Sequence, residues 1–342
     1  MSAPDTAPTP PPQAVLMQMS MGYAAPFLLR AAAQLCLADH LVDGPRTAEE
    51  LAPATSSHAP SLYRLMRTLA CFGILSEDET RRFSLTPLAE PLRSNVPGSV
   101  RTSILSITSD LFTIPWSNLH DAVQTGRSAF DQHFGMPFFD YLTGHPEDAS
   151  MFSDLLIGIN SADAPAIAAA YDFSSCSHIA DIGGGTGHLL ATILASHPGP
   201  RGTLFDLPHS AAGAAQLIET RGMTDRMTFS PGSFFEQVPA GCDLYLLSHI
   251  IHDWSEEQCL TILSHCHRAM SPTARLLILE MVLTGGNAFH PGKVLDMTML
   301  ATTPGQERTE PEYRTLLDKA SFRLTRIIPT TSAVSIVEAV RA

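Results

Sequence analysis

The stretch that decides the fold is Asp181-Ile182-Gly183-Gly184-Gly185-Thr186-Gly187, a glycine-rich run directly after an apolar segment at 177–182. The segment before the run has the composition of a buried strand, and residues 187–195 after it have helical periodicity. Glycines in such a strand–turn–helix unit let the backbone approach a ligand closely and adopt positive φ. The run therefore predicts a nucleotide-type ligand at the end of this strand.

The spacing of the glycines limits which nucleotide fits. Gly183, Gly185 and Gly187 form G-x-G-x-G, whereas a dinucleotide fingerprint requires G-x-G-x-x-G. His188 occupies the last position of that alternative, and Leu190 occupies the last position of the frame that begins at Gly185. This spacing disfavours a nicotinamide dinucleotide.

A single acidic residue follows the next apolar segment. Asp206 lies 23 residues after Gly183, at the end of a predicted strand at 202–205. A carboxylate at this place can accept hydrogen bonds from both hydroxyls of a ribose, and it disfavours a 2′-phosphorylated cofactor. The alternative is that Asp206 only caps the loop before Leu207-Pro208.

The C-terminal part of the chain alternates strands and helices. Strands are predicted at 177–182, 202–205, 227–230, 242–247, 275–279, 322–328 and 334–340. Helices are predicted between them, including one at 256–270 that a capping box at Ser255 and Gln258 opens. This alternation is typical of an α/β fold with a parallel sheet covered on both faces, so residues 173–342 are predicted to form a Rossmann-like domain. Ligands of such sheets bind beyond the carboxyl ends of the strands.

Three further regions precede this domain. Residues 1–13 are rich in proline and are predicted to be a disordered leader. Residues 14–100 contain two helices followed by a hairpin at 72–85, the order of a winged-helix unit. Residues 101–172 are mostly helical and rich in bulky apolar side chains, which predicts a linker that contributes to a substrate pocket.

The charge of the chain argues against nucleic acid and anionic membranes as partners. The net charge is -13, and the helix in the position of a recognition helix, 61–71, offers only Arg64 and Arg67 as basic residues. A winged-helix regulator with a small-molecule sensor domain is therefore the weaker alternative. The segment 23–41 is more apolar than one small domain needs, which favours a homodimer through the N-terminal domain.

The same segment is too polar to span a bilayer, because Pro26 and Arg30 interrupt it. No secretory signal is recognisable at the N-terminus. The six cysteines include no Cys-x-x-Cys pair, which is typical of reduced thiols in a cytoplasmic protein.

Four motifs together resemble one enzyme family. They are Asp181–Gly187, Leu204–Pro208, His249–Trp254 and Pro304–Glu310. In this order and spacing they resemble the class I small-molecule O-methyltransferases, of the plant caffeic acid and acetylserotonin type and with many bacterial natural-product members. The resemblance runs from about residue 20 to the C-terminus. It implies S-adenosylmethionine as the cofactor, S-adenosylhomocysteine as the product, and dimerisation through the N-terminal region.

The resemblance also implies a set of cofactor contacts. The glycine run would meet the methionine part of the cofactor, and Asp206 the ribose. Ser233 stands where relatives usually carry an acid for the adenine amino group, and Ser248 stands where they often carry Lys or Arg, so both contacts should be weaker. The full predicted set is Asp181, Gly183, Gly184, Gly185, Asp206, Leu207, Ser233, Phe234 and Ser248.

His252 is the predicted catalytic base. It follows the fourth strand of the domain, at the ligand-binding edge, and a neutral imidazole can take the proton of a phenol. By the resemblance, Glu280 and Glu307 bracket His252. Glu280 is the stronger candidate for orienting the imidazole because a charge at the end of an apolar strand needs a partner, whereas Glu307 could be a solvated loop acid. Asp253 also matches the motif, with a helix N-terminal role as its alternative.

A metal site is not predicted. His249 precedes His252 by three residues, but no cluster of Cys or His supplies further ligands.

The acceptor is expected to be aromatic. Thioethers and aromatic rings pack against planar molecules, although core packing is the alternative role for each of these side chains. The predicted substrate-binding residues are Trp116, Met136, Phe152, Met297 and Met299, and Trp254 is expected nearby. The sequence thus predicts methylation of a hydroxyl, most simply a phenol, on an aromatic or polyketide-like small molecule. N- or C-methylation, or a non-methylating reaction on the same fold, are the alternatives.

Overall fold

The computed structural model describes residues 10–342, without the side chains of 160–162, and the chain divides between Ser109 and Asp110 into two compact units. Residues 1–9 of the expected leader lie outside the described residues. Residues 10 and 11 have no regular secondary structure, but the last two residues of the expected leader already belong to helix α1 (Pro12–Ser20). Proline suits this first turn, where no intrahelical N–H is needed.

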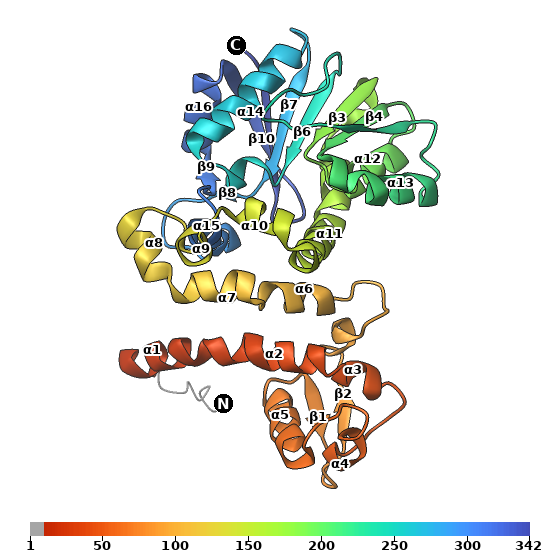
Figure 1. Cartoon of the computed structure of the whole chain (residues 1–342), viewed down its shortest axis with the longest axis vertical. Helices are drawn as coiled ribbons and strands as arrows, with labels where there is room; N and C mark the ends of the chain where they lie inside the picture. The colour runs from red at the N-terminus through yellow and green to blue at the C-terminus, as the bar shows by residue number, and fades with distance from the viewer. Residues whose placement is uncertain (1–9) are drawn as a thin grey trace, which may run out of the picture. The chain divides into compact units, whose positions relative to one another are not determined.

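The first unit is mostly helical (Figure 1). The predicted order of helix, helix and hairpin is confirmed, with β1 and β2 antiparallel, and Thr47 and Glu50 form the expected capping box of α4. The assignment of this unit as a winged helix stays a prediction. After α1, the elements are η1 (Met21–Tyr23), α2 (Ala24–Gln34), α3 (Leu37–His40), α4 (Ala48–Leu51), α5 (Ala59–Cys71), β1 (Leu75–Glu77), β2 (Phe83–Leu85), η2 (Glu90–Leu92) and α6 (Arg101–Ile107).

The boundary of the first unit lies nine residues beyond the predicted one, at 109 instead of 100. Helix α6 belongs to this unit because two guanidinium groups join it to α2. Arg101 Nε donates to the carbonyl of Ala33 at 2.8 Å, and Arg30 donates to the carbonyl of Leu105 at 3.1 Å. The sequence pattern showed a helix here but not which neighbour it would bond.

The second unit begins with the predicted helical region. Its helices are α7 (Asp110–Ser117), α8 (Leu119–Thr125), α9 (Ala129–Phe134), α10 (Phe138–Gly144) and α11 (Pro146–Ala170). Leu111, Phe130, Phe138 and Leu142 form a small apolar core of their own, with partly buried aromatic side chains around it. Most of the bulky side chains of this region are therefore core, as their composition suggested.

A seven-stranded sheet forms the centre of the second unit, with strand order β10-β11-β7-β6-β3-β4-β5. The strands are β3 (His178–Ile182), β4 (Arg201–Asp206), β5 (Met227–Pro231), β6 (Leu244–Ser248), β7 (Arg275–Glu280), β10 (Phe322–Pro329) and β11 (Ser335–Arg341). Strands β3 to β7 are parallel, as predicted. Strand β11 corrects the all-parallel expectation, since it is antiparallel to both neighbours. The short link at 330–334 allows a hairpin but no crossover.

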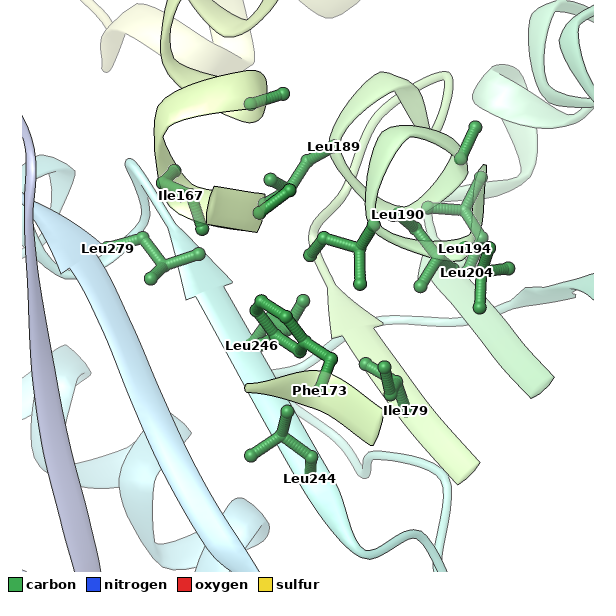
Figure 2. Close-up of a cluster of buried hydrophobic side chains, with 14 of the residues drawn as sticks. Ile167, Phe173, Ile179, Leu189, Leu190, Leu194, Leu204, Leu244, Leu246 and Leu279 are labelled. Carbon is green, nitrogen blue, oxygen red and sulfur yellow. The ribbon is translucent and has the colours of Figure 1, made fainter. Parts of the chain in front are cut away.

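Both faces of this sheet are covered. Leu244 and Leu246 of β6 face the core beneath α11, α12 and α13, which Figure 2 shows in part. Tyr245 and Leu247, which alternate with them, face α14 and α16 on the opposite side (Figure 1). The covering helices and the remaining short elements are α12 (His188–Ser196), α13 (Ala211–Thr220), α14 (Glu256–Ala269), α15 (Pro291–Thr302), α16 (Glu310–Lys319), η3 (Phe173–Ser175), η4 (Pro208–Ser210), η5 (Ile251–Asp253), β8 (Val282–Leu283) and β9 (Arg308–Thr309).

None of the helices among the described residues combines the length and the apolar character that crossing a membrane requires.

Candidate active site

Four predicted site residues lie at one edge of the sheet. Asp181 is in β3, Asp206 ends β4, Ser248 ends β6 and Glu280 ends β7. These strands are parallel, so their carboxyl ends lie at the same edge. The turn η5, which contains His252, begins shortly after Ser248.

The glycine run forms the tight turn that its sequence predicted. Gly183 has φ +72°, a conformation that residues with a side chain rarely adopt, and a Cβ there would also lie 2.6 Å from Ile250 Cδ1. Gly185 has φ +59°, and a Cβ there would meet nothing within 4 Å. The backbone at Gly185 therefore faces open space into which a ligand can come close.

Asp181 lies just before this turn without any partner. Its side chain is fully buried, and neither carboxylate oxygen has a hydrogen-bond partner. Burial, followed by the negative charge of Asp206, raises the pKa of Asp181 to about 7, against a smaller opposing effect of the Leu190 N–H, which does not reach hydrogen-bonding geometry. A buried, unpartnered carboxylate is costly, so this position favours a ligand that brings hydrogen-bond donors.

The carboxylate of Asp206 already accepts hydrogen bonds from nearby loop residues. Its oxygens accept hydrogen bonds from the Gly185 N–H at 2.7 Å, the Leu207 N–H at 2.6 Å and the Ser210 hydroxyl at 3.0 Å. The capping role, which the sequence left open, is thus present. A carboxylate has about four acceptor positions, so one remains for a ribose hydroxyl. The ribose contact of Asp206 stays a prediction.

The other predicted cofactor residues border the same turn. The Phe234 ring lies against Gly183, 3.2 Å from the position of a Cβ there. The Ser233 hydroxyl accepts a hydrogen bond from the Phe235 N–H at 3.2 Å. The Ser248 hydroxyl is buried without a hydrogen-bond partner, like the carboxylate of Asp181.

His252 is hydrogen-bonded to one carboxylate and has a second carboxylate near its other nitrogen. The Nδ1 atom lies 2.5 Å from Glu307 Oε1, and the Nε2 atom lies 3.7 Å from Asp253 Oδ1. The imidazole is almost fully buried. Glu280, by contrast, bonds the backbone around it, accepting from the N–H groups of Ile250 and His252 at 3.2 and 3.1 Å.

The sequence favoured Glu280 as the carboxylate that orients the imidazole, but in the structure Glu307 makes this contact. Glu307 orients the imidazole and is 3% exposed, so it is not a solvated loop acid. Its loop folds tightly onto the His252 turn, because a Cβ at Gly305 would lie 1.8 Å from the His252 carbonyl oxygen. Spacing alone could not show this approach, although a glycine two residues before Glu307 was a usable signal.

The carboxylates control the charge of His252. Burial lowers the pKa of His252, but the charge of Asp253, the hydrogen bond to Glu307 and the charge of Glu280 outweigh burial and raise it to about 10. Burial raises the pKa of Asp253 to about 6, although His252 opposes this shift. Burial also raises the pKa of Glu307. The group is best described as one proton-binding unit.

Sequence reasoning missed several residues that hold this unit in place. Tyr313 of α16 donates a hydrogen bond from its hydroxyl to Glu280. Arg308 donates to the carbonyl of Ile251 at 3.1 Å, and Asp296 accepts a hydrogen bond from the Glu307 N–H at 2.9 Å. Tyr313 and Arg308 are buried, and only Arg308 stood inside a motif.

His249 has a partner that the sequence did not suggest. It has a positive φ of 52°, and its Nε2 lies 3.3 Å from the carboxylate of Asp163 in α11. This contact joins the turn after β6 to helix α11. Left-handed backbone at a residue other than glycine is uncommon and needs support from its surroundings.

The predicted substrate residues are only partly brought together. Phe152 packs edge-on against Phe138 at a ring-centroid distance of 5.1 Å, while Trp116 and Met136 are exposed. Met299 is buried in α15, which also contains Met297. The roles of all five stay predictions.

A stacked aromatic pair links the helical region to the His252 turn. Phe139 of α10 stacks on Trp254 at 5.0 Å with an interplanar angle of 25°. Trp254 was expected near the acceptor, whereas Phe139 was not singled out. The pair places aromatic surface two residues after His252 in the chain.

Comparison with known proteins places this geometry in a family. Residues 116–323 match the O-methyltransferase domain, and residues 17–95 match the O-methyltransferase dimerisation domain. The chain belongs to this O-methyltransferase family.

Individual relatives agree over nearly the whole length. The chain is 42% identical to phenazine O-methyltransferase PhzM of Lysobacter antibioticus, over 96% of both chains. It is 34% identical to 8-amino-8-demethylriboflavin N,N-dimethyltransferase of Streptomyces davaonensis, over 94% of both chains. The solved structure of the O-methyltransferase NcsB1 of neocarzinostatin biosynthesis, in complex with S-adenosylmethionine and 2-hydroxy-5-methyl naphthoic acid, has a TM-score of 0.83 at 32% identity. It covers 93% of this chain and 96% of its own.

The expected family, fold class and enzyme class are thereby confirmed. The chain is a methyltransferase with S-adenosylmethionine as its cofactor, and its N-terminal region is a dimerisation domain.

Proposed function

We propose that the protein methylates a hydroxyl, most simply a phenol, of an aromatic small molecule, with His252 as the general base. The observation that carries this proposal is the His252–Glu307 contact of 2.5 Å at the ligand-binding edge of the sheet. An imidazole whose Nδ1 is held by a carboxylate has its tautomer fixed, and its Nε2 is then the atom that takes a proton.

The glycine run supplies a place that fits the cofactor. Asp181 and Ser248 have buried polar atoms without partners at the ends of adjacent strands, and the backbone at Gly185 faces open space. The cofactor's ammonium and hydroxyl groups are donors of the kind that these positions lack. With Asp206, Ser233 and Phe234, they would hold the cofactor, which when bound supplies an activated methyl group.

The protein's own part is to position the acceptor and to remove its proton. Without ligands, burial lowers the pKa of His252, but the neighbouring carboxylates outweigh burial and raise the pKa to about 10, so the imidazole holds a proton at neutral pH and must lose it before it can act as the base. Asp253 and Glu307 then stabilise the imidazolium that forms. With the cofactor bound, the positive charge of its sulfonium would lower the pKa of the nearby imidazole and so favour its neutral form before the reaction.

The aromatic character of the acceptor is supported by two observations. The stacked pair Phe139 and Trp254 joins the aromatic core of the helical region to the His252 turn. The related O-methyltransferase NcsB1 was solved with a naphthoic acid, and the related PhzM is named for phenazine. We include Phe152, Met297, Met299, Trp116 and Met136 in the acceptor pocket as part of the proposal.

N-methylation is the second candidate function, because one relative is an N,N-dimethyltransferase. The buried base favours oxygen, since a neutral amine has a free lone pair and needs no proton removed before it attacks.

One experiment tests the proposal directly. The purified protein is incubated with methyl-labelled S-adenosylmethionine and matched pairs of phenols and anilines of one, two and three rings, and the labelled atom is located in the product. We expect transfer to a phenolic oxygen. The variant His252→Gln should lose about 10² to 10⁴ of the turnover on that phenol. Transfer to anilines alone, or full turnover by His252→Gln, would contradict the proposal.

We further propose a homodimer formed through the N-terminal unit. Leu16, Met17, Met19, Met21 and Tyr23 are between 63% and 71% exposed, which is unusual for a free surface. Light scattering on the purified protein should give twice the chain mass, and charged residues at Met17 and Met21 should shift it to the monomer. A cytoplasmic location fits the six free cysteines and stays part of this proposal.

A further inference from the structure

The backbone around His252 is held from two directions. Glu280 accepts the N–H groups of Ile250 and His252 through one carboxylate oxygen, Oε1. From the other side, Arg308 donates to the carbonyl of Ile251, and the Cys259 thiol lies 3.2 Å from the same oxygen. The peptide groups before the base therefore have fixed partners on both sides.

Among the described residues, the second oxygen of Glu280 has one hydrogen-bond partner. Tyr313 donates its hydroxyl to Oε2, and both side chains are fully buried. Burial, and then the charge of Glu280, raises the pKa of Tyr313 well above its ordinary value, so the hydroxyl stays a donor at physiological pH. The two N–H groups restrain the carboxylate at Oε1 only, and the Tyr313 hydroxyl adds a bond at Oε2 that restricts its rotation about the terminal bond.

Tyr313 is well placed for this role by its own helix. The capping box of Thr309 and Glu312 fixes the start of α16, and Tyr313 lies in the first turn of that helix. The preceding strand β9 contains Arg308, and Glu307 comes directly before it. A single chain segment thus supplies the orienting carboxylate, the guanidinium and the hydroxyl that surround the His252 turn.

We propose that Tyr313 is a positioning residue for methyl transfer, which fixes the backbone of the His252 turn by orienting the Glu280 carboxylate. This inference rests on the proposed role of His252 as the base. Tyr313 touches neither the imidazole nor the open space beside Gly185 in any contact the structure shows. Its effect must therefore pass through Glu280.

The test compares Tyr313→Phe with a matched control, Tyr171→Phe. Tyr171 is also a buried tyrosine whose hydroxyl donates to a buried glutamate, Glu338, at 2.7 Å, but that pair lies between α11 and β11. Both variants lose a hydroxyl–carboxylate bond and keep the ring, and Tyr171→Phe also loses the bond that its hydroxyl accepts from Arg275 at 3.2 Å. We expect the melting temperature of Tyr171→Phe to fall at least as far as that of Tyr313→Phe.

The kinetics should separate the two variants. Tyr313→Phe should lower kcat about ten-fold, because a base that is displaced by a fraction of an ångström loses alignment with the acceptor. The KM for S-adenosylmethionine should not change, since the glycine run is not touched. Tyr171→Phe should keep the wild-type kcat. Equal kcat values for the two variants, or a change confined to KM, would overturn the proposal.

A double-mutant cycle with Glu280→Gln tests the route of the effect. When the amide oxygen of the glutamine accepts the two N–H groups, its NH2 group faces Tyr313, so the phenol can no longer donate to residue 280 and the charge-assisted bond is lost. Tyr313→Phe should therefore lower kcat much less in the Glu280→Gln background than in the wild type. Additive losses would show that Tyr313 does not act through Glu280. If Tyr313→Phe does not fold, Glu280→Gln alone must lower kcat at unchanged KM, and a wild-type kcat there would also overturn the proposal.

The role of the base is tested separately by His252→Gln. If that variant keeps full turnover, the proposed function fails. If it loses turnover while Tyr313→Phe behaves like Tyr171→Phe, only the inference about Tyr313 fails.

Discussion

The two halves of the ligand-binding edge are built differently. At β3 and β4, Asp181 is buried without any partner and the backbone at Gly185 faces open space. At β6 and β7, His252 and Glu280 both have partners within the protein. Around Asp181 and Gly185 the protein leaves room for a ligand, although Asp206 beside them is already hydrogen-bonded, whereas the hydrogen bonds around His252 and Glu280 are already in place.

The difference follows from what each half has to do. A cofactor site binds and releases its ligand, so its polar groups must be free to exchange partners. A base must stand in one position whether or not the acceptor is present, so its orientation is fixed in advance by buried hydrogen bonds. Four variants would break or sharpen this contrast.

Asp181→Asn should have the largest effect, on stability. The folded-state pKa of Asp181, about 7, lies above that of an unfolded aspartate, so the folded protein binds the proton more tightly. The stability that this tighter proton binding contributes is present at low pH and is lost as the pH rises through about 7. At pH 8 the variant should stabilise the ligand-free protein by up to about 4 kcal/mol, and at pH 4 by much less.

Urea unfolding at the two pH values measures this change, with and without S-adenosylhomocysteine. The ligand should reduce the advantage of the variant, because it supplies donors to the native carboxylate. Asp243→Asn is the control, since hydrogen bonds from Ser177 lower the pKa of Asp243 and its loss should destabilise at pH 8. If the difference in unfolding free energy between Asp181→Asn and the wild type were the same at both pH values, Asp181 would not be an unpartnered carboxylate that waits for a ligand.

Gly305→Ala should have the next largest effect, on turnover. The added Cβ would lie 1.8 Å from the His252 carbonyl oxygen, so the turn or the Glu307 loop must move. We expect kcat to fall by about 10² with little change in KM for the cofactor. Gly199→Ala is the control, because a Cβ there meets nothing within 4 Å. A wild-type kcat for Gly305→Ala would show that the base tolerates displacement.

Asp253→Asn should shift the pH dependence. The charge of Asp253 is the largest of the contributions that raise the pKa of His252, so its removal should lower that pKa. The limb of kcat/KM for the acceptor that rises with pH should move to lower pH by on the order of one unit. Asp318→Asn, at an exposed position of α16, should leave the profile in place. If the rising limb of the pH profile does not move in Asp253→Asn, that limb reports the titration of a group other than His252.

Ser233→Asp should have the smallest effect, on cofactor affinity. An aspartate can still accept the Phe235 N–H and can add a charge-assisted hydrogen bond to an adenine amino group. We expect calorimetry to give about three- to ten-fold tighter S-adenosylhomocysteine binding. Ser233→Ala should bind slightly more weakly than the wild type. Equal affinities for all three proteins would remove Ser233 from the cofactor site.

The sequence by itself determined the elements and the edge at which they meet. The glycine spacing, Asp206 and the alternation of strands and helices predicted the α/β domain, and His252 followed a predicted strand at the right end. These features are local, because hydrophobic periodicity and glycine conformation depend on near neighbours in the chain.

Only the tertiary structure decided which carboxylate serves which partner. Glu307 and His252 are 55 residues apart, and their contact depends on the tight approach of the Gly305 loop. Glu280 ends an apolar strand and was therefore expected at the imidazole, but it bonds the backbone of the His252 turn and the hydroxyl of Tyr313. Sequence spacing shows that a buried charge needs a partner, and the packing of distant segments determines which partner it finds.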